Sequence, residues 1–407
     1  MPRDLEYYIR SGGSLSLGHA IGLGLGLLTT YVFTNFTSQR TYAHFGYVLA
    51  VLSVASLAAL PGVDSAILHA VARGRAGALG PGTRLRLKAS FLGTFGMLLW
   101  SALLGATGRR DEAAVVAWCS LLVPLIYPFT SVFSFLQGQG RFVEYTLANL
   151  AIEIAKTAAV ALAALALGLD GTPVILAPFL AMGLGYFLLT RYYDAGAPTF
   201  EPGPEFRSLG RALTGAAALG TIAGQVDRFL VGTFFGPAAM AAYHLAFSLT
   251  YPLRGFGTLA GQLLFPRIVS SGSTAPGFRR KYGLGLSALA TALIGLVAGY
   301  WLIFPVIQRH LFPGYEDAVP IARWLIVATS LAIFDTVAGQ ALWGLEDLRG
   351  VKWTQSFFPL QRMAFLAMGG YAAGVPGILA GQVAHYALSA SILIGFWVRG
   401  FRPRGSP

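Results

Sequence analysis

Five basic side chains lie inside long apolar segments of the chain, where a charge needs a chemical reason. They are Lys156, Arg228, Arg254, Arg323 and Arg362. An ionised arginine in hydrocarbon costs about 2.5–3.5 kcal/mol even on a lenient scale, so these side chains are expected to face a partner or a polar cavity. Only Arg323 has a simple interfacial interpretation, in which its charged end extends to water. The pattern indicates that something polar is handled inside a membrane.

Acidic and uncharged polar residues accompany these bases at helical spacing. Asn149, Glu153 and Lys156 lie at i, i+4 and i+7, which is one face of a helix. They either line a cavity or include an acid–base pair that only neutralises itself. Asp227 points about 100° away from its neighbour Arg228, so it either pairs with another helix or carries a coupling ion. The predicted cavity or coupling residues are Glu153, Asp227, Asp335, Gln225 and Tyr251.

Signatures of catalysis are not found in the sequence. No His, Cys, Asp and Glu residues have metal-ligand spacing, and Gly22-x-Gly24-x-Gly26 is typical of helix packing rather than of a phosphate-binding loop. His244 and His385 are expected to be packing residues that form hydrogen bonds. We therefore predict no catalytic residue, no metal and no cofactor, with H⁺ or Na⁺ as candidate coupling ions. Residues 308–318, the longest outer loop, are short for the active site of a membrane-embedded enzyme.

Composition restricts the class of protein further. The 407 residues are 55% apolar and 11% charged, and the mean hydropathy is +0.63. Such a chain cannot cover itself with a hydrated surface, so a soluble fold is excluded. The net charge of +12 would suggest nucleic acid in a soluble protein. Here the basic residues cluster in short loops between apolar runs, so we predict a lipid bilayer as partner and no nucleic acid.

Apolar runs predict an all-α integral membrane protein with about twelve transmembrane helices. A helix needs about 20 apolar residues to cross a bilayer. Prolines at positions 124, 128, 252, 305 and 359 are candidate bends, because a proline removes a backbone donor. The predicted spans are roughly 13–34, 42–70, 89–107, 113–136, 143–167, 172–190, 208–235, 237–265, 282–307, 319–344, 353–373 and 376–398.

Lysine and arginine in the loops predict the orientation. With the amino terminus inside, the inner segments hold 20 basic residues and the outer loops hold 4. Cytoplasmic loops carry the excess of Lys and Arg, so both termini are predicted to be cytoplasmic. The first apolar run follows Arg10 and has no convincing cleavage site, so it is expected to be a retained helix rather than a signal peptide.

The two halves of the chain resemble each other. A shift of 196 residues places residues 46–50 (GYVLA) on residues 242–246 (AYHLA). The polar, proline-rich segment 191–207 lies between the halves. We therefore predict two six-helix lobes around a central cavity, with residues 1–200 forming the first lobe and residues 201–407 the second.

The start of the second half carries a family resemblance. Residues 225–232 (QVDRFLVG), 235–239 (FGPAA) and 242–246 (AYHLA) resemble the corresponding region of Wzx-type polysaccharide flippases, which belong to the multidrug/oligosaccharidyl-lipid/polysaccharide (MOP) exporter superfamily. The resemblance implies translocation of an undecaprenyl-diphosphate-linked oligosaccharide from the cytoplasmic to the periplasmic leaflet by alternating access. It also implies a bacterial inner-membrane location, a monomer, and contacts with other membrane proteins of polysaccharide assembly. The residues then predicted to bind the diphosphate are Lys156, Arg228, Arg254 and Arg362.

A multidrug and toxin extrusion (MATE) exporter of the same superfamily is the alternative transporter. It would need an acidic cavity for cationic drugs, whereas the embedded charge here is mainly basic. Lipid II flippases are also related, but they typically have two additional helices, for which this chain has no room. The enzyme alternative is a membrane-embedded polysaccharide polymerase or ligase, for which the short outer loops give little support.

Overall fold

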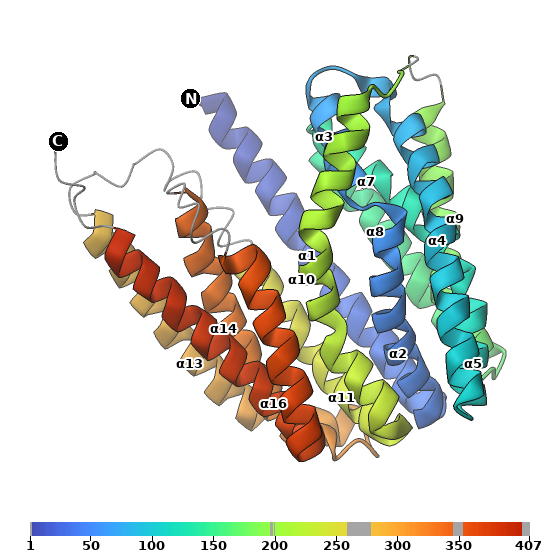
Figure 1. Cartoon of the computed structure of the whole chain (residues 1–407), viewed down its shortest axis with the longest axis vertical. Coiled ribbons are helices and arrows are strands. Elements are labelled where there is room, and N and C mark those ends of the chain that lie inside the picture. Colours follow the sequence, from blue (N-terminus) through green and yellow to red (C-terminus); the bar gives the residue numbers. More distant parts are fainter. Residues whose placement is uncertain (1, 196–197, 199, 259–277, 345–352, 401–407) are drawn as a thin grey trace. The chain divides into compact units, whose positions relative to one another are not determined.

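The structure is a computed structural model and is helical throughout the residues it describes, which are 2–195, 198, 200–258, 278–344 and 353–400 (Figure 1). The contacts divide the chain into two compact units, Met1–Gln225 and Val226–Pro407. The division into lobes at residue 200 stays a prediction. The long helix that follows this position, α10 (Pro204–Phe234), is shared between the two units.

Unit 1 consists of long helices, two of which are interrupted by tight turns. In chain order the elements that precede α10 are α1 (Pro2–Phe36), α2 (Gln39–Ala55), η1 (Ser56–Ala59), α3 (Gly62–Ala72), η2 (Ala76–Ala78), α4 (Leu79–Ala106), α5 (Arg110–Ser120), α6 (Leu122–Ile126), η3 (Tyr127–Thr130), α7 (Ser131–Gly138), α8 (Phe142–Ala161), η4 (Leu162–Ala166) and α9 (Thr172–Asp194). Of these elements, η1, η2 and η3 are 3₁₀ segments and η4 is a π-turn.

The predicted span 42–70 is not one continuous helix. It is divided into α2, η1 and α3, and Leu60 between η1 and α3 has a left-handed backbone with φ of 52°. Pro61 explains the break, because a proline disfavours the helical conformation of the residue before it. The predicted span 113–136 is interrupted in the same way at η3, which contains Pro128. There the hydroxyl of Thr190 donates to the carbonyl of Phe129, which supplies a partner at the irregular turn.

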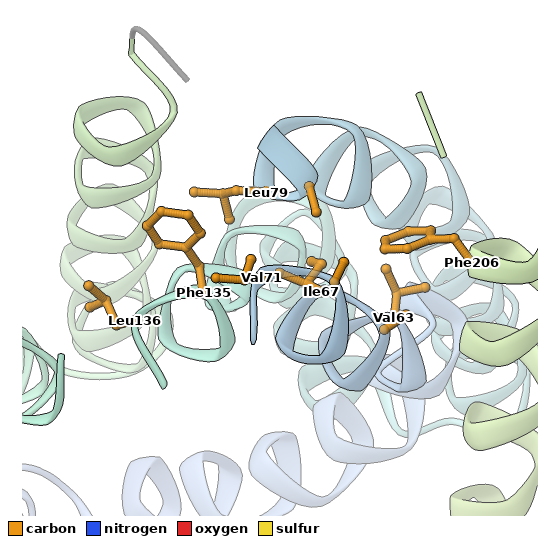
Figure 2. Packing of buried hydrophobic residues seen from close by; sticks show 10 residues of the cluster. Val63, Ile67, Val71, Leu79, Phe135, Leu136 and Phe206 are labelled. Carbon is orange, nitrogen blue, oxygen red and sulfur yellow. The ribbon is translucent and has the colours of Figure 1, made fainter. Parts of the chain in front are cut away.

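An apolar cluster holds the short helix α3 in unit 1. Val63, Ile67 and Val71 follow one another at helical spacing along α3 and are buried. Figure 2 shows Phe206 of α10 beside Val63 and Phe135 of α7 beside Val71. Lipid tails are as apolar as these side chains, so close packing rather than escape from water holds such a cluster inside a membrane.

Unit 2 contains the end of α10 and the helices that follow it. Gly236 has φ of +83°, a conformation that glycine adopts without strain, and it makes the tight turn from α10 into α11. The predicted span 237–265 begins as α11, but its last residues lie outside the described part of the chain. The elements are α11 (Gly236–Thr250), the 3₁₀ segment η5 (Tyr251–Leu253), α13 (Phe278–Leu311), α14 (Ala318–Gly344), the π-turn η6 (Trp353–Phe357) and α16 (Phe358–Gly400).

Helix α16 consists of two arms that meet at a sharp kink. Ala373 and Gly374 have non-helical backbone angles, so residues 358–372 form a first arm and residues 375–400 a second. The arms pack backbone against backbone: a methyl group added at Gly377 would lie 1.9 Å from the carbonyl oxygen of Gly369. Small residues allow such close approach in membrane helices. The two arms correspond to the predicted spans 353–373 and 376–398.

The twelve-helix prediction is confirmed. Nine helices in the described part of the chain are long and apolar enough to cross a membrane. One of them is α16, whose two arms account for two predicted spans. The charged helix α10 and the 15-residue α11 account for the other two. Two of the prolines predicted to be bends, Pro128 and Pro252, lie in 3₁₀ segments that interrupt the helices. At Pro305, in contrast, helix α13 continues.

Candidate functional site

A buried carboxylate in unit 2 is surrounded by polar side chains from α11 and from both arms of α16. Asp227 of α10 is only 1% exposed, and its Oδ2 accepts a hydrogen bond of 2.7 Å from the hydroxyl of Tyr243 of α11. Gln382 of the second arm of α16 donates its Nε2 to the same oxygen at 2.7 Å. The Nη2 of Arg362, on the first arm, lies 3.6 Å from this oxygen. Asp227 thus pairs with another helix, as one of its two alternatives predicted, and a role in ion coupling stays a prediction.

Arg362 has an acidic partner on another helix. The neighbouring turns of its own helix contain no acid. The acid is Asp227, which comes from α10. Arg362 is 8% exposed, and its Nε has no hydrogen-bond partner among the described residues. The ion pair therefore uses only part of the donor capacity of the guanidinium group, which carries five N–H groups.

Two arginines of unit 2 share one aromatic ring. The guanidinium carbon of Arg254 lies 5.0 Å from the ring centroid of Tyr386, and that of Arg362 lies 5.7 Å from the same centroid. Arg254 also lies 5.1 Å from the ring centroid of Tyr251, which is 45% exposed. The negative face of an aromatic ring attracts a cation most strongly where water is excluded. These contacts allow two like charges to share one apolar region.

A third arginine and a second carboxylate complete the arrangement. Arg228 is 7% exposed, and its guanidinium carbon lies 4.2 Å from the ring centroid of Phe247. Asp335 of α14 lies near Ser389 and interacts electrostatically with Arg254. We call Arg228, Arg254, Arg362, Asp227 and Asp335 the arginine cluster. Its three bases and two acids give it an excess of positive charge.

The two histidines beside the cluster are buried. His244 of α11 and His385 of α16 are each 4% exposed. The ring of His385 lies tilted against that of Tyr386, with 4.7 Å between the centroids. The burial agrees with the expected packing role, although the Nδ1 of His385 has no hydrogen-bond partner among the described residues.

The predicted pair Glu153 and Lys156 lies in unit 1. The carboxylate and the ammonium group form an ion pair on one face of α8, and the two side chains are 22% and 24% exposed. The structure thus shows the pairing, and a role in substrate transport stays a prediction. Gln225 lies on α10 at the end of unit 1.

A buried arginine in unit 1 was missed by the sequence argument. Arg86 is 2% exposed and forms an ion pair with Asp64 of α3. Its Nε donates to the carbonyl of Ala59 at 3.0 Å, and its Nη1 donates to the hydroxyls of Thr130 at 3.1 Å and Ser131 at 2.8 Å. Arg86 therefore connects the two broken helices of this unit, at η1 and at η3.

The signal for Arg86 was present in the sequence but was ambiguous. It lies in a basic run with Arg84 and Lys88 between the predicted spans 42–70 and 89–107, and such a run is typical of a cytoplasmic loop. The structure instead begins α4 at Leu79, so Arg86 lies two turns inside a helix. Within the described residues, no three His, Cys, Asp or Glu side chains are arranged to hold a metal ion.

Comparison with known proteins identifies the family. Residues 8–271 match the family described as "Polysaccharide biosynthesis protein", and the chain belongs to this family. A search of functionally curated proteins gave no significant match.

Solved structures of transporters share the fold. The chain is similar to an inward-facing MATE family multidrug resistance transporter of the MOP superfamily, with a TM-score of 0.71 and 16% identity over 97% of this chain and 100% of that one. An outward-facing MATE structure gives a TM-score of 0.63 and 15% identity over 96% and 95%. A MOP superfamily transporter from Pyrococcus furiosus gives a TM-score of 0.66 and 17% identity over 96% and 95%.

The chain is thus a multi-pass integral membrane protein with the MOP transporter fold. This confirms the predicted all-α membrane fold, and the fold is that of transporters rather than of an enzyme. The family match confirms the predicted link to polysaccharide biosynthesis. The similarity to solved structures confirms the fold of the predicted superfamily.

Proposed function

We propose that this protein flips an undecaprenyl-diphosphate-linked oligosaccharide from the cytoplasmic to the periplasmic leaflet of the bacterial inner membrane by alternating access. The arginine cluster is the observation that carries this proposal. A diphosphate is anionic, and its binding inside a membrane requires fixed positive charge that the protein has already stabilised. The substrate-binding residues of the proposal are Arg228, Arg254 and Arg362 in unit 2 and Lys156 in unit 1.

The sign of the embedded charge favours an anion over a cationic drug. Arg254 and Arg362 are held by the ring of Tyr386 rather than by a carboxylate alone. Guanidinium groups bind phosphate in a bidentate manner, and stacking on an aromatic ring leaves their in-plane donors available. The Pyrococcus furiosus MOP transporter has a binding pocket of reverse polarity, which suggests a different function for that protein. The basic excess of the arginine cluster fits a comparable departure from drug export.

Topology and partners complete the proposal. Arg86 lies inside α4 and is left out of the loop count, and the remaining 19 inner basic residues against 4 outer ones support two cytoplasmic termini. The lipid tail stays in the bilayer while the sugar and diphosphate cross. The protein acts as a monomer, contacts other membrane proteins of polysaccharide assembly, and is coupled to H⁺ or Na⁺, with Glu153, Asp227, Asp335, Gln225 and Tyr251 as the cavity or coupling residues.

Substitution of the three arginines tests the proposal. Each Arg→Gln change removes a charge-assisted hydrogen bond worth about 1.5–3 kcal/mol, which corresponds to an about 10- to 100-fold loss of substrate affinity. We expect Arg228→Gln, Arg254→Gln and Arg362→Gln to stay in the membrane and to lose transport. The corresponding lysine variants should keep part of it, because the charge remains although the bidentate fork is lost. The measurement is surface-polysaccharide display in a flippase-null strain, divided by membrane abundance.

A matched control separates a specific effect from a general loss of charge. Arg323 is an exposed residue of α14 whose guanidinium carbon lies 5.8 Å from the ring centroid of Trp301. Arg323→Gln should therefore leave display unchanged. Full display in all three cluster variants would overturn the cationic-site proposal. Resistance to cationic drugs without any effect on surface polysaccharide would instead favour the MATE-type exporter.

A further inference from the structure

The hydrogen bonds of Asp227 are unequal. Tyr243 and Gln382, both neutral, donate to Oδ2 at 2.7 Å each, whereas the cationic Nη2 of Arg362 lies 3.6 Å from this oxygen. A charge-assisted hydrogen bond between a guanidinium and a carboxylate is normally about 2.7–2.9 Å long. The neutral donors therefore hold Asp227 at a distance where it attracts Arg362 without forming a full hydrogen bond with it.

Both members of the pair keep unused hydrogen-bonding capacity. Among the described residues, neither the Nε of Arg362 nor the Oδ1 of Asp227 has a hydrogen-bond partner, although both atoms are buried. An unsatisfied buried polar group costs about 1–3 kcal/mol. An arginine whose Nε has no partner, beside a carboxylate that does not saturate it, is a site prepared for a second anion.

Gln382 and Tyr243 also bond to each other, which fixes the position of Asp227. Gln382 donates its Nε2 to the hydroxyl of Tyr243 at 2.7 Å, in addition to its bond with Asp227. Asp227 is therefore anchored by α11 and by the second arm of α16, while Arg362 extends from the first arm. A movement of Arg362 away from Asp227 would leave this anchored triad intact.

We propose that Asp227 is an internal counter-anion that competes with the substrate's phosphate groups for Arg362. This inference rests on the proposed function and specifies how its site is regulated. In the resting protein, Asp227 holds Arg362 and keeps weakly binding anions out. A diphosphate displaces it, because a second phosphate can engage Arg254, which shares the Tyr386 ring with Arg362. After translocation Asp227 recaptures Arg362 and so promotes release of the substrate, because transport requires binding that is reversible.

Competition has a measurable cost for affinity. If Asp227 occupies Arg362 in about nine of ten resting molecules, the apparent dissociation constant for the anion is about ten times the intrinsic value. Asp227→Asn keeps an oxygen that accepts from Tyr243 and Gln382 but removes the competing charge. We therefore expect Asp227→Asn to bind inorganic pyrophosphate about tenfold more tightly than the natural protein. Display per molecule should fall, because release is slowed.

The experiment uses the full-length protein purified in detergent, with pyrophosphate binding measured by calorimetry. Asp317→Asn is the matched control, since it removes the same charge from an exposed loop of unit 2 and should leave the affinity unchanged. In a double-mutant cycle, Asp227→Asn should have no effect on pyrophosphate binding when Arg362 is already glutamine. An equal effect in both backgrounds would overturn competition for Arg362.

A second variant tests the same competition and should change the affinity for pyrophosphate in the opposite direction. Tyr243→Phe removes one donor that holds Asp227, so Asp227 pairs more fully with Arg362 and pyrophosphate should bind several-fold more weakly. Unchanged affinity in Tyr243→Phe overturns the proposal, and so does weaker binding in Asp227→Asn, which would mean that Asp227 only positions Arg362. Failure of the proposed function looks different: wild type and Arg362→Gln would then bind pyrophosphate equally poorly.

Discussion

Replacing Arg86 by methionine removes a buried charge from the point where two broken helices of unit 1 meet. The change leaves Asp64 without its cation and leaves the carbonyl of Ala59 without the donor Nε. Breaking a buried ion pair from one side costs about 3–5 kcal/mol. The lower end applies here, because the side chain of Asp64 is 25% exposed and keeps a 2.8 Å hydrogen bond from Ser131. We expect Arg86→Met to lower the free energy of unfolding by about 3 kcal/mol.

A double substitution shows how much of the lost free energy of unfolding comes from the unpaired Asp64. Replacing a buried ion pair by apolar residues of similar volume is often neutral or stabilising. In the double variant Arg86→Met and Asp64→Leu, only the loss of hydrogen bonds such as that to Ala59 remains, which is worth about 1 kcal/mol. The double variant should therefore be about 2 kcal/mol more stable than the single variant.

The assay is a denaturant titration of purified protein in mixed micelles, together with membrane abundance in cells. Display should fall only in proportion to abundance, because Arg86 is assigned a structural role. Two results would refute this reasoning. One is a single variant that costs less than about 1 kcal/mol, the value expected for an exposed pair. The other is a double variant as unstable as the single one, since the lost energy would then not come from the unpaired Asp64.

Two further predictions concern topology and the ion pair in α8. A reporter that is active only in the periplasm should be silent after Pro407 and active within residues 308–318, and a periplasmic carboxyl terminus would contradict the proposed orientation. Lys156→Ala and Glu153→Ala should each lower membrane abundance, because each leaves one charge of the pair uncompensated. Replacing both by apolar residues should restore abundance and display together if the pair is only structural. Restored abundance without display would place the pair in the substrate path.

Features that are local in the sequence were predictable. The spans follow from apolar runs, and the α8 pair follows from spacing on one helix, where Glu153 and Lys156 are three residues apart. Helix breaks were predictable only in part. A proline such as Pro128 shows where a backbone hydrogen bond is lost, but it does not show whether the helix ends there. Packing decides whether the helix continues, as α13 does through Pro305.

Partners on different helices were not predictable from one sequence. Helical spacing reports neighbours on one helix, so it gave no indication that Asp227 lies beside Arg362 and Gln382. Arg86 was missed for a related reason: its charge places it in a loop by composition, and only the acid on another helix explains its burial. In each case the informative contact is long-range, and hydropathy along the chain does not record it.

The two halves nevertheless repeat one structural device, with different electrostatic results. The 196-residue shift places η5 (Tyr251–Leu253) within a few residues of η1 (Ser56–Ala59), so each half interrupts its second helix at a similar place. In unit 1 a buried arginine, Arg86, donates its Nε to the η1 carbonyl of Ala59, and its Nη1 contacts Asp64 and donates to Ser131. In unit 2 Arg254 directly follows the break, and its Nε has no hydrogen-bond partner within the described residues. The same kind of interruption thus fixes a helix in one half and presents a partly unsatisfied cation in the other, and this difference is why we assign most of the anion-binding groups to unit 2.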